Sequence, residues 1–484
     1  MKILLASSEV HPFSKTGGLA DMVGALAKTL AGFGHRVGLV TPLYSGLREK
    51  FPKIKKLNWD INLPLGPGQV AAEVWTLSVS ARLTIYFIRQ PDFFERPGLY
   101  QEAGRDYPDN AARFVFFSKC VAQLARYLPW KPELVHVHDW QAALVPLFVR
   151  HQSLSDGWHR VPHTCLTIHN LAYQGNFPAS AFELTNLPAG YFNPKGVEFF
   201  NHLNCLKAGI VFSDIITTVS PRYAREIMTG QFGCGLEGIL QQRRESVFGI
   251  LNGVDYSEWR TTRNSFLRHP FSAKRISGKL SGKLALQKEM GLPVNAKIPL
   301  FATVSRLADQ KGVDILLGAL EEMLGNEMQF ILLGNGSPFF ENAYRDLARR
   351  YPDKVGVRIG FDQGLSHRIE AGSDFFLMPS LYEPCGLNQM YSQRYGTIPV
   401  VRTTGGLDDS VVDDSEDPAK ATGIKFAEYS APALARAIRR ALNLFQDPPR
   451  FRAYRINGMK ADFSWKRTGE HYLRAYEQAQ AQLT

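Results

Sequence analysis

The sequence predicts an α/β protein made of two nucleotide-type domains, each built on a parallel sheet. Apolar segments of strand length alternate with helical segments in the first half of the chain, and the alternation starts again in the second half. The tetrapeptide Thr-Gly-Gly-Leu occurs at 16–19 and again at 404–407. Because a glycine turn at the start of a helix can hold phosphate, one turn in each half indicates two domains that face a shared cleft.

The individual elements follow from two patterns. Strands buried on both faces are short apolar runs, whereas helices place apolar residues three and four positions apart. In the first half we expect strands at 3–6, 37–41, 84–88, 134–138, 164–168 and 215–219, and helices at 19–30, 110–127 and 141–150. In the second half we expect strands at 299–304, 330–333, 355–359, 375–378 and 399–401, and helices at 313–324, 341–351 and 431–445.

A domain boundary is expected near Asn252-Gly253, a strong turn dipeptide that a basic, polar stretch follows. The first domain would span residues 1–254 and the second 255–462. The last segment, 463–484, is helical and rich in Ala, Gln and Glu. Its residues would allow it to cap either domain, and we expect it to pack back on the first.

Length and composition indicate a globular protein. A chain of 484 residues suits two large domains, and 45% hydrophobic with 21% charged residues is a globular balance. The apolar start ends at Ser7, too early for a signal peptide, and no apolar run approaches the roughly 18 residues of a membrane span. The five cysteines are scattered without a Cys-x-x-Cys pair, which favours reduced thiols. We therefore expect a cytoplasmic protein, or one in another soluble compartment such as a plastid.

The formal net charge of +11 raises the question of nucleic-acid binding. The densest basic stretch, residues 260–283, contains two phenylalanines but no recognisable nucleic-acid motif. A solvated loop near a domain junction is the favoured interpretation. A basic protein can also attract an anionic small substrate.

The first glycine turn, Lys15-Thr16-Gly17-Gly18, follows the first strand and precedes a helix. Backbone N–H groups, the helix N-terminus and the lysine would together bind an anion. The alternative is an ordinary turn with a surface lysine. The spacings Gly-x-Gly-x-x-Gly and Gly-x-x-x-x-Gly-Lys are absent here, which argues against a standard dinucleotide fingerprint and an ATPase.

Two further strand ends in the first half carry candidate site residues. His136 and His138 alternate on one face of the strand 134–138, and Asp139 stands at its exit. A metal site would need a third ligand that the sequence does not identify, so a buried histidine pair is favoured. Asp139 and His169, which follows the next strand, are better placed to contact a substrate.

The second half offers cations and a carboxylate at strand ends. Arg306 and Lys311 lie on one loop and suit the oxygens of a diphosphate, although solvated surface cations are the alternative. Glu383 follows the strand 375–378 and could bind sugar hydroxyls or stabilise positive charge at a reacting carbon. Cys385 has no histidine near it in sequence, so a structural thiol is favoured over a nucleophile. No Asp-x-Asp pair occurs, so cations would take the place of a metal at the diphosphate.

Taken together, these segments resemble bacterial glycogen synthases and plant starch synthases, in order and over nearly the whole chain. The first motif and the Glu-Pro-Cys-Gly-Leu segment are the most specific. The matching segments are 15–19 (KTGGL), 106–110 (DYPDN), 138–140 (HDW), 169–175 (HNLAYQG), 252–255 (NGVD), 305–307 (SRL), 310–312 (QKG), 383–387 (EPCGL) and 404–407 (TGGL).

The resemblance implies a GT-B glycosyltransferase fold, with two Rossmann-like domains whose parallel sheets face an interdomain cleft. It implies transfer of glucose from ADP-glucose to the nonreducing 4-OH of an α-1,4-glucan, with retention of configuration and no required metal or other cofactor. The expected partners are ADP-glucose and an α-1,4-glucan such as glycogen, starch or a malto-oligosaccharide, without nucleic acid or membrane. The oligomeric state stays open.

Site residues are carried over from the resemblance position by position. Cations of both domains would stabilise the leaving ADP when the cleft closes and excludes water. The expected catalytic residues are Glu383, His169, Asp139, Lys15, Arg306 and Lys311; the nucleotide-sugar site adds Gly17, Gly18, Phe361, Thr404, Gly405 and Gly406; the acceptor side has Glu9, Asp21 and Asn170.

One departure concerns the ribose contact. Many retaining glycosyltransferases carry a second glutamate eight residues after the first, where this chain has Tyr391. Two alternative functions stay open: a GT-B enzyme that uses UDP-glucose or a small acceptor, and a non-catalytic protein that binds glucan or nucleic acid.

Overall fold

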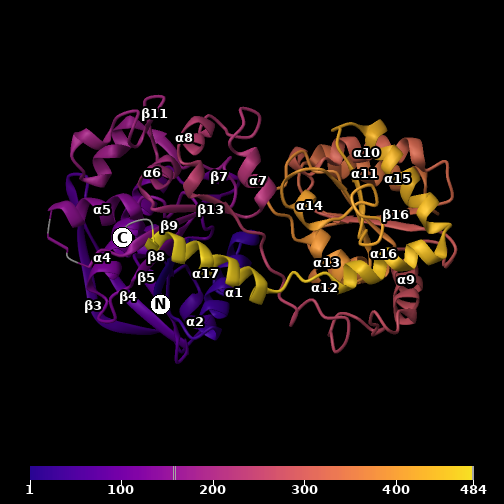
Figure 1. The fold of residues 1–484 in the computed structure, drawn as a ribbon, viewed down its shortest axis with the longest axis horizontal. Coiled ribbons are helices and arrows are strands. Elements are labelled where there is room, and N and C mark those ends of the chain that lie inside the picture. The colour runs from indigo at the N-terminus through magenta and orange to yellow at the C-terminus, as the bar shows by residue number, and fades with distance from the viewer. Residues whose placement is uncertain (156, 159, 482–484) are drawn as a thin grey trace. The chain divides into compact units, whose positions relative to one another are not determined.

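The computed structural model describes residues 1–155, 157–158 and 160–481, and the chain forms two compact units (Figure 1). The first unit comprises Met1–Val219, Ala224–Ile250 and the chain from Trp465 onward. The second comprises Ser220–Tyr223 and Leu251–Ser464. The sequence predicts a domain boundary between residues 254 and 255 and a terminal segment that starts at 463; positions 482–484 of that segment lie outside the described residues.

The first unit is built on a nine-stranded sheet with the order β14-β13-β9-β8-β1-β2-β5-β4-β3. Pairing is parallel from β14 to β5, and β4 and β3 extend that edge in antiparallel fashion. The parallel strands are β1 (Lys2–Ala6), β2 (Arg36–Pro42), β5 (Leu83–Arg89), β8 (Leu134–His138), β9 (His163–Ile168), β13 (Ile215–Thr218) and β14 (Val247–Gly249).

The antiparallel hairpin of β3 (Lys55–Leu65) and β4 (Gly68–Ser80) is absent from the sequence prediction. Strand β3 carries lysine, asparagine and aspartate at exposed positions, and only alternate residues of the hairpin, such as Ile61 and Val74, are buried. A search for continuous apolar runs finds strands buried on both faces and misses half-exposed edge strands of this kind.

Helices cover the sheet of the first unit. The helix expected at 141–150 starts later, at Val145, because residues 139–143 form tight turns in which the N–H groups of Ala142 and Ala143 donate to the carbonyls of Asp139 and Trp140. The main helices are α1 (Gly18–Gly32), α4 (Asn110–Tyr127), α5 (Val145–Ser155), α6 (Cys205–Phe212), α8 (Glu237–Gln242) and α17 (Trp465–Ala481).

The C-terminal helix α17, yellow in Figure 1, packs on α1, β9 and β13 of the first unit. Tyr472 and Tyr476 are fully buried in this contact. The Tyr476 hydroxyl lies 2.8 Å from Nδ1 of His136 on β8. A long amphipathic segment thus completes the core of the unit that contains the N-terminus.

The second unit has a six-stranded, all-parallel sheet with the order β17-β16-β15-β18-β19-β20. Counted along the chain this is 3-2-1-4-5-6, the Rossmann order. Five of the strands coincide with predicted segments, and the short β20 was not predicted. The strands are β15 (Leu300–Val304), β16 (Gln329–Gly334), β17 (Val355–Ile359), β18 (Phe375–Met378), β19 (Ile398–Arg402) and β20 (Ile424–Phe426).

Apolar clusters lie on both faces of this sheet. One contains Leu316, Leu320 and Ile438 from α10 and α15, and the other contains Leu286 and Ile369 from α9 and α12. Both faces of a parallel sheet must be covered in this way to remove apolar side chains from water. The helices are α9 (Ser277–Glu289), α10 (Val313–Met323), α11 (Pro338–Arg350), α12 (Gln363–Gly372), α13 (Asn388–Arg394), α14 (Gly405–Ser410), α15 (Ala431–Phe445) and α16 (Pro448–Lys460).

The predicted α/β fold with two parallel-sheet units is confirmed. Within the described ranges, no helix combines the length and the apolar character needed to cross a bilayer.

Candidate active site

In both units the strand order reverses beside the first strand. The loops after β1 and β8 in the first unit, and after β15 and β18 in the second, leave the sheet in opposite directions. Ligands of open parallel sheets bind in the crevice that such a reversal leaves at the carboxyl ends of the strands. These loops carry part of the candidate site residues of each unit, while His169 and Asn170 follow β9, Phe361 follows β17 and residues 404–406 follow β19.

Glu9 anchors the first glycine turn. It is 3% exposed, and its carboxylate accepts hydrogen bonds from the Thr16 backbone N–H (2.5 Å) and the Thr16 hydroxyl (2.6 Å). The Tyr100 hydroxyl also donates to it, at 2.8 Å. Glu9 therefore fixes the position of Lys15–Gly18 at the start of α1. Tyr100, which no sequence pattern indicated, holds Glu9 in place.

Lys15 and Asp21 form an ion pair. The Lys15 ammonium lies 2.7 Å from Oδ2 of Asp21, and about half of the lysine side chain is exposed. Gly17 directly precedes α1 and Gly18 begins it, and both glycines are exposed. The ion pair joins a residue expected at the diphosphate to one expected at the acceptor.

Asp139 and His169 are brought together at the ends of β8 and β9. Oδ1 of Asp139 accepts the His169 backbone N–H at 2.7 Å. Asp139 has φ of +54°, a left-handed conformation that aspartate tolerates better than most residues. Burial raises the pKa of its carboxyl to about 7, with a further contribution from the charge of Glu9, although the N–H groups of His169 and Asn170 oppose the shift.

The histidine pair of β8 is buried, as favoured from the sequence. The His136 and His138 rings lie 4.2 Å apart, and Nδ1 of His138 is 3.1 Å from Nε2 of His169. Burial lowers the pKa of His136 and of His169 to about 3, so both are neutral at physiological pH. Across the described residues, no group of three or more His, Cys, Asp or Glu side chains could hold a metal ion. Asn170 is half-buried, and its side-chain oxygen accepts the Ala172 N–H.

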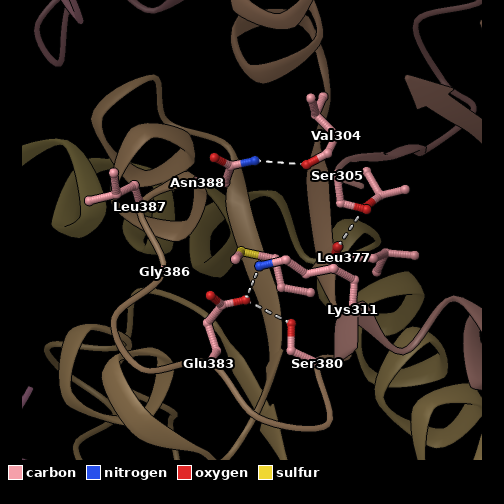
Figure 2. A pocket seen from close by; sticks show the side chains of 11 residues that line it. Val304, Ser305, Lys311, Leu377, Ser380, Glu383, Gly386, Leu387 and Asn388 are labelled. Carbon is pink, nitrogen blue, oxygen red and sulfur yellow. Dashed lines mark hydrogen bonds and ion pairs between the residues drawn. The ribbon is translucent and has the colours of Figure 1, made fainter. Parts of the chain in front are cut away.

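In the second unit, Lys311, Glu383 and Ser380 meet at the edge of a cavity of about 150 Å³ (Figure 2). The Lys311 ammonium lies 2.6 Å from Oε2 of Glu383, and the Ser380 hydroxyl donates to the same oxygen at 3.0 Å. The Glu383 side chain is only 7% exposed. One carboxylate oxygen is thus fixed by two donors, which leaves the other for a ligand. Ser380 lies two residues after the end of β18, and no sequence pattern indicated a role for it.

Arg306 stands at the end of β15 and is exposed. Within the part of the chain that the structure describes, no hydrogen bond or ion pair engages its guanidinium. Phe361, after β17, is 89% exposed. Both side chains are therefore accessible to a ligand at the carboxyl edge of this sheet.

The second glycine turn packs directly against the backbone that carries Glu383. Gly405 has φ of +44°, and a Cβ there would lie 2.0 Å from the Glu383 carbonyl oxygen. The Gly406 N–H donates to that carbonyl at 3.1 Å, and a Cβ at Gly406 would lie 2.1 Å from the carbonyl oxygen of Cys385. Thr404 is buried beside them. The two glycines thus allow the close approach that positions Glu383.

Tyr391 lies flat on Trp259, with ring centroids 3.6 Å apart and an interplanar angle of 7°. The position at which wider retaining glycosyltransferases have a second glutamate therefore carries an aromatic stack in this chain. Cys385 is buried, and burial raises the pKa of its thiol to about 12, which agrees with a structural role.

Known families match both units. The family described as starch synthase catalytic domain matches residues 2–242, and the family described as glycosyl transferases group 1 matches residues 288–457. The chain is similar to proteins named glycogen synthase from Anaeromyxobacter sp. (strain Fw109-5), 46% identical over 98% of this chain and 99% of that protein, and from Koribacter versatilis (strain Ellin345), 43% identical over 99% and 98%.

Two solved structures are similar to this chain over 99% of its length. The catalytic domain of starch synthase IV from Arabidopsis thaliana, bound to ADP and acarbose, superposes with a TM-score of 0.89 at 32% identity, over 99% of both chains. Sucrose-phosphate synthase from Thermosynechococcus elongatus, at 19% identity and a TM-score of 0.60, shares the fold.

Gly405→Ala is expected to destabilise the second unit by at least about 2 kcal/mol, because the methyl group would overlap the Glu383 carbonyl and φ is positive. Urea unfolding followed by tryptophan fluorescence measures the change. The matched control is Gly325→Ala, where an added Cβ meets nothing within 4 Å. Equal unfolding midpoints for the two variants would contradict the packing role of Gly405.

Asp139 should make stability depend on pH. The unfolded chain releases this proton near the ordinary value of 3.8, whereas the folded protein holds it up to about pH 7. Between these values the folded state binds more protons, so its free energy of unfolding falls as pH rises, by up to about 4 kcal/mol. The advantage in stability of Asp139→Asn over the wild type should grow from pH 4 to 7 and then level off.

Urea titrations at pH 4, 5, 6, 7 and 8 measure this difference. Glu102→Gln removes an exposed carboxyl of the same unit and serves as the control. If the stability difference of Asp139→Asn changed with pH no more than that of Glu102→Gln, the raised pKa of Asp139 would be contradicted.

Proposed function

The chain belongs to the glycogen and starch synthase family, and on that premise we propose that it transfers glucose from ADP-glucose to the nonreducing 4-OH of an α-1,4-glucan with retention of configuration. It is a glucan-elongating glucosyltransferase, because its full-length relatives are glycogen synthases and its first half matches the starch synthase catalytic domain.

The observation that carries the proposal is the arrangement of Lys311, Glu383 and Ser380 at the strand reversal of the second unit. A cation and a buried carboxylate lie side by side there, as a substrate with an anionic diphosphate and a hydroxyl-rich sugar requires. The related Arabidopsis domain was solved with ADP and acarbose bound. We propose that this chain binds an adenine nucleotide and a glucan in the same manner.

Cations would stabilise the leaving diphosphate in place of a metal. Lys311 offers an ammonium next to Glu383, and the unengaged guanidinium of Arg306 can form a bidentate contact with phosphate oxygens. We propose that Lys15 of the first unit supplies a third positive charge, and that Phe361 and the 404–406 turn contact the nucleotide.

The sugar would be held by neutral and charged groups with different tasks. The free oxygen of Glu383 accepts hydrogen bonds from sugar hydroxyls while Lys311 and Ser380 hold the other oxygen. His169, which is neutral because burial lowers its pKa to about 3, hydrogen-bonds a hydroxyl without adding charge. Asp139 lies beside it. Asp21 and Asn170 are proposed at the acceptor, and Glu9 supports them by fixing the first glycine turn.

In the proposed reaction, the bond from the anomeric carbon to the diphosphate oxygen breaks and its electron pair leaves with ADP. The acceptor O4 forms its bond to the same carbon on the same face, and the hydroxyl proton passes to the departing phosphate oxygen. Positive side chains around the diphosphate lower the barrier by stabilising the charge that develops there.

Five unpaired cysteines support a reducing, cytoplasmic location.

The test is an assay of ADP release with purified protein, ADP-glucose and glycogen, run in parallel with UDP-glucose. We expect ADP release with elongation of radiolabelled glucan chains, without added metal and in the presence of a chelator. Strong preference for UDP-glucose without glucan elongation would favour the alternative donor. Salt-dependent nucleic-acid binding without any glucosyl transfer would favour the non-catalytic alternative.

Lys15→Ala is expected to lower kcat/KM for ADP-glucose about a hundredfold, because it removes one positive charge that would stabilise the negative charge developing on the leaving diphosphate. Lys28→Ala, an exposed lysine on α1, is the matched control and should change it less than twofold. Unchanged kinetics for Lys15→Ala would show that Lys15 is not part of the donor site.

A further inference from the structure

His138 has an unusual set of hydrogen-bond partners. It is fully buried on β8, and its Nδ1 lies 3.1 Å from Nε2 of His169. Its other nitrogen, Nε2, is buried with no hydrogen-bond partner among the described residues. Among the described residues, the contact with His169 is therefore the one hydrogen bond that the His138 ring makes.

The neighbouring His136 differs in this respect. Its Nδ1 is 2.8 Å from the Tyr476 hydroxyl, and its Nε2 is 2.6 Å from the Thr167 hydroxyl. Hydroxyl groups can donate or accept, so His136 is satisfied as either tautomer. Its partners lie on α17 and within β9, so His136 supports the core of the unit.

Counting protons fixes the direction of the His138–His169 bond. Two neutral imidazoles share one hydrogen bond, so one ring donates and the other accepts. If the proton of His138 were on Nε2, a buried N–H would have no acceptor, which is rarer and more costly than a bare acceptor nitrogen. The proton therefore belongs on Nδ1 of His138, which donates to Nε2 of His169.

The direction of this bond determines the tautomer of His169. Because its Nε2 accepts, its own proton must be on Nδ1, since the tautomer of an imidazole is set by the bond that its other nitrogen makes. Among the described residues, Nδ1 of His169 has no hydrogen-bond partner, and the residue is only half-buried. Nδ1 is thus a fixed donor that is available to a substrate.

We propose that His138 is a positioning residue that locks His169 in the Nδ1-protonated tautomer, so that His169 donates a hydrogen bond to a hydroxyl oxygen of the transferred glucose. The inference rests on the proposed contact between His169 and the sugar. It explains why a buried histidine, one of whose nitrogens has no partner among the described residues, occupies the last position of β8, directly before Asp139. An apolar residue there would leave His169 free to adopt either tautomer.

The first test is a double-mutant cycle on glucosyl transfer. His138→Leu removes the donor, and we expect kcat to fall about tenfold with little change in KM for the glucan. In a His169→Ala background, His138→Leu should change kcat less than twofold, because its target is gone. In the protein that retains His169, His138→Asn should keep most of the activity that His138→Leu loses, because its amide N–H can take the place of Nδ1–H.

Two results would overturn the proposal. One is an equal loss from His138→Leu with and without His169, which would assign His138 a structural role. The other is a failure of His138→Asn to recover activity although it folds. His136→Leu is the control for a structural histidine: its thermal stability should fall, and its effect on kcat should be the same in both His169 backgrounds.

A second measurement does not need activity or a folded His138 variant. In the ¹H–¹⁵N spectrum of histidine-labelled wild-type protein, the signals lost in His169→Ala identify His169. We expect the pattern of an Nδ1-protonated imidazole; an Nε2-protonated pattern would overturn the proposal. If the wild-type protein transferred no glucose, the proposed function would fail, and this spectrum would still decide the tautomer.

Discussion

The reversal of strand order beside the first strand is the constraint on which both candidate sites depend. Adjacent parallel strands normally send their loops over the same helix layer, whereas strands on either side of a reversal send them apart. In the first unit Asp139 and His169 meet beside this reversal, and in the second Lys311 and Glu383 line a cavity there. Each unit therefore presents polar side chains on a rigid sheet edge.

The sequence predicted much of this arrangement because the relevant information is local. A strand followed by Lys311 or Glu383, and a strand followed by Asp139, can be recognised from a few residues, and parallel sheets bring such strand ends together. Long-range partners could not be predicted. The bond from Tyr100 to Glu9 and the stack of Tyr391 on Trp259 join segments whose proximity depends on the whole fold. The hairpin of β3 and β4 was missed because its apolar residues alternate.

The two Thr-Gly-Gly-Leu turns show how one tetrapeptide can meet different physical demands. Around Gly17, an added Cβ would meet nothing within 4 Å, and the turn is held from outside by Glu9. At Gly405 and Gly406, backbone atoms of the Glu383 segment leave no space for a side chain. The first turn is thus open to a ligand, whereas the second is required for packing. Sequence identity alone could not separate these cases, because both turns precede a helix.

In the second unit, the ion pair of Lys311 and Glu383 links the proposed diphosphate contact to the proposed sugar contact. Removing a carboxylate from water is costly, and Lys311 and Ser380 offset that cost at a single oxygen of Glu383. An ammonium has three N–H donors, so one bond to Glu383 leaves two for phosphate oxygens. Lys311 can therefore contact the carboxylate at the sugar and the leaving diphosphate at once. A planar guanidinium at position 311 would direct its donors differently, which gives a physical reason for lysine there. At position 306 the planar fork of arginine suits a bidentate contact with phosphate oxygens.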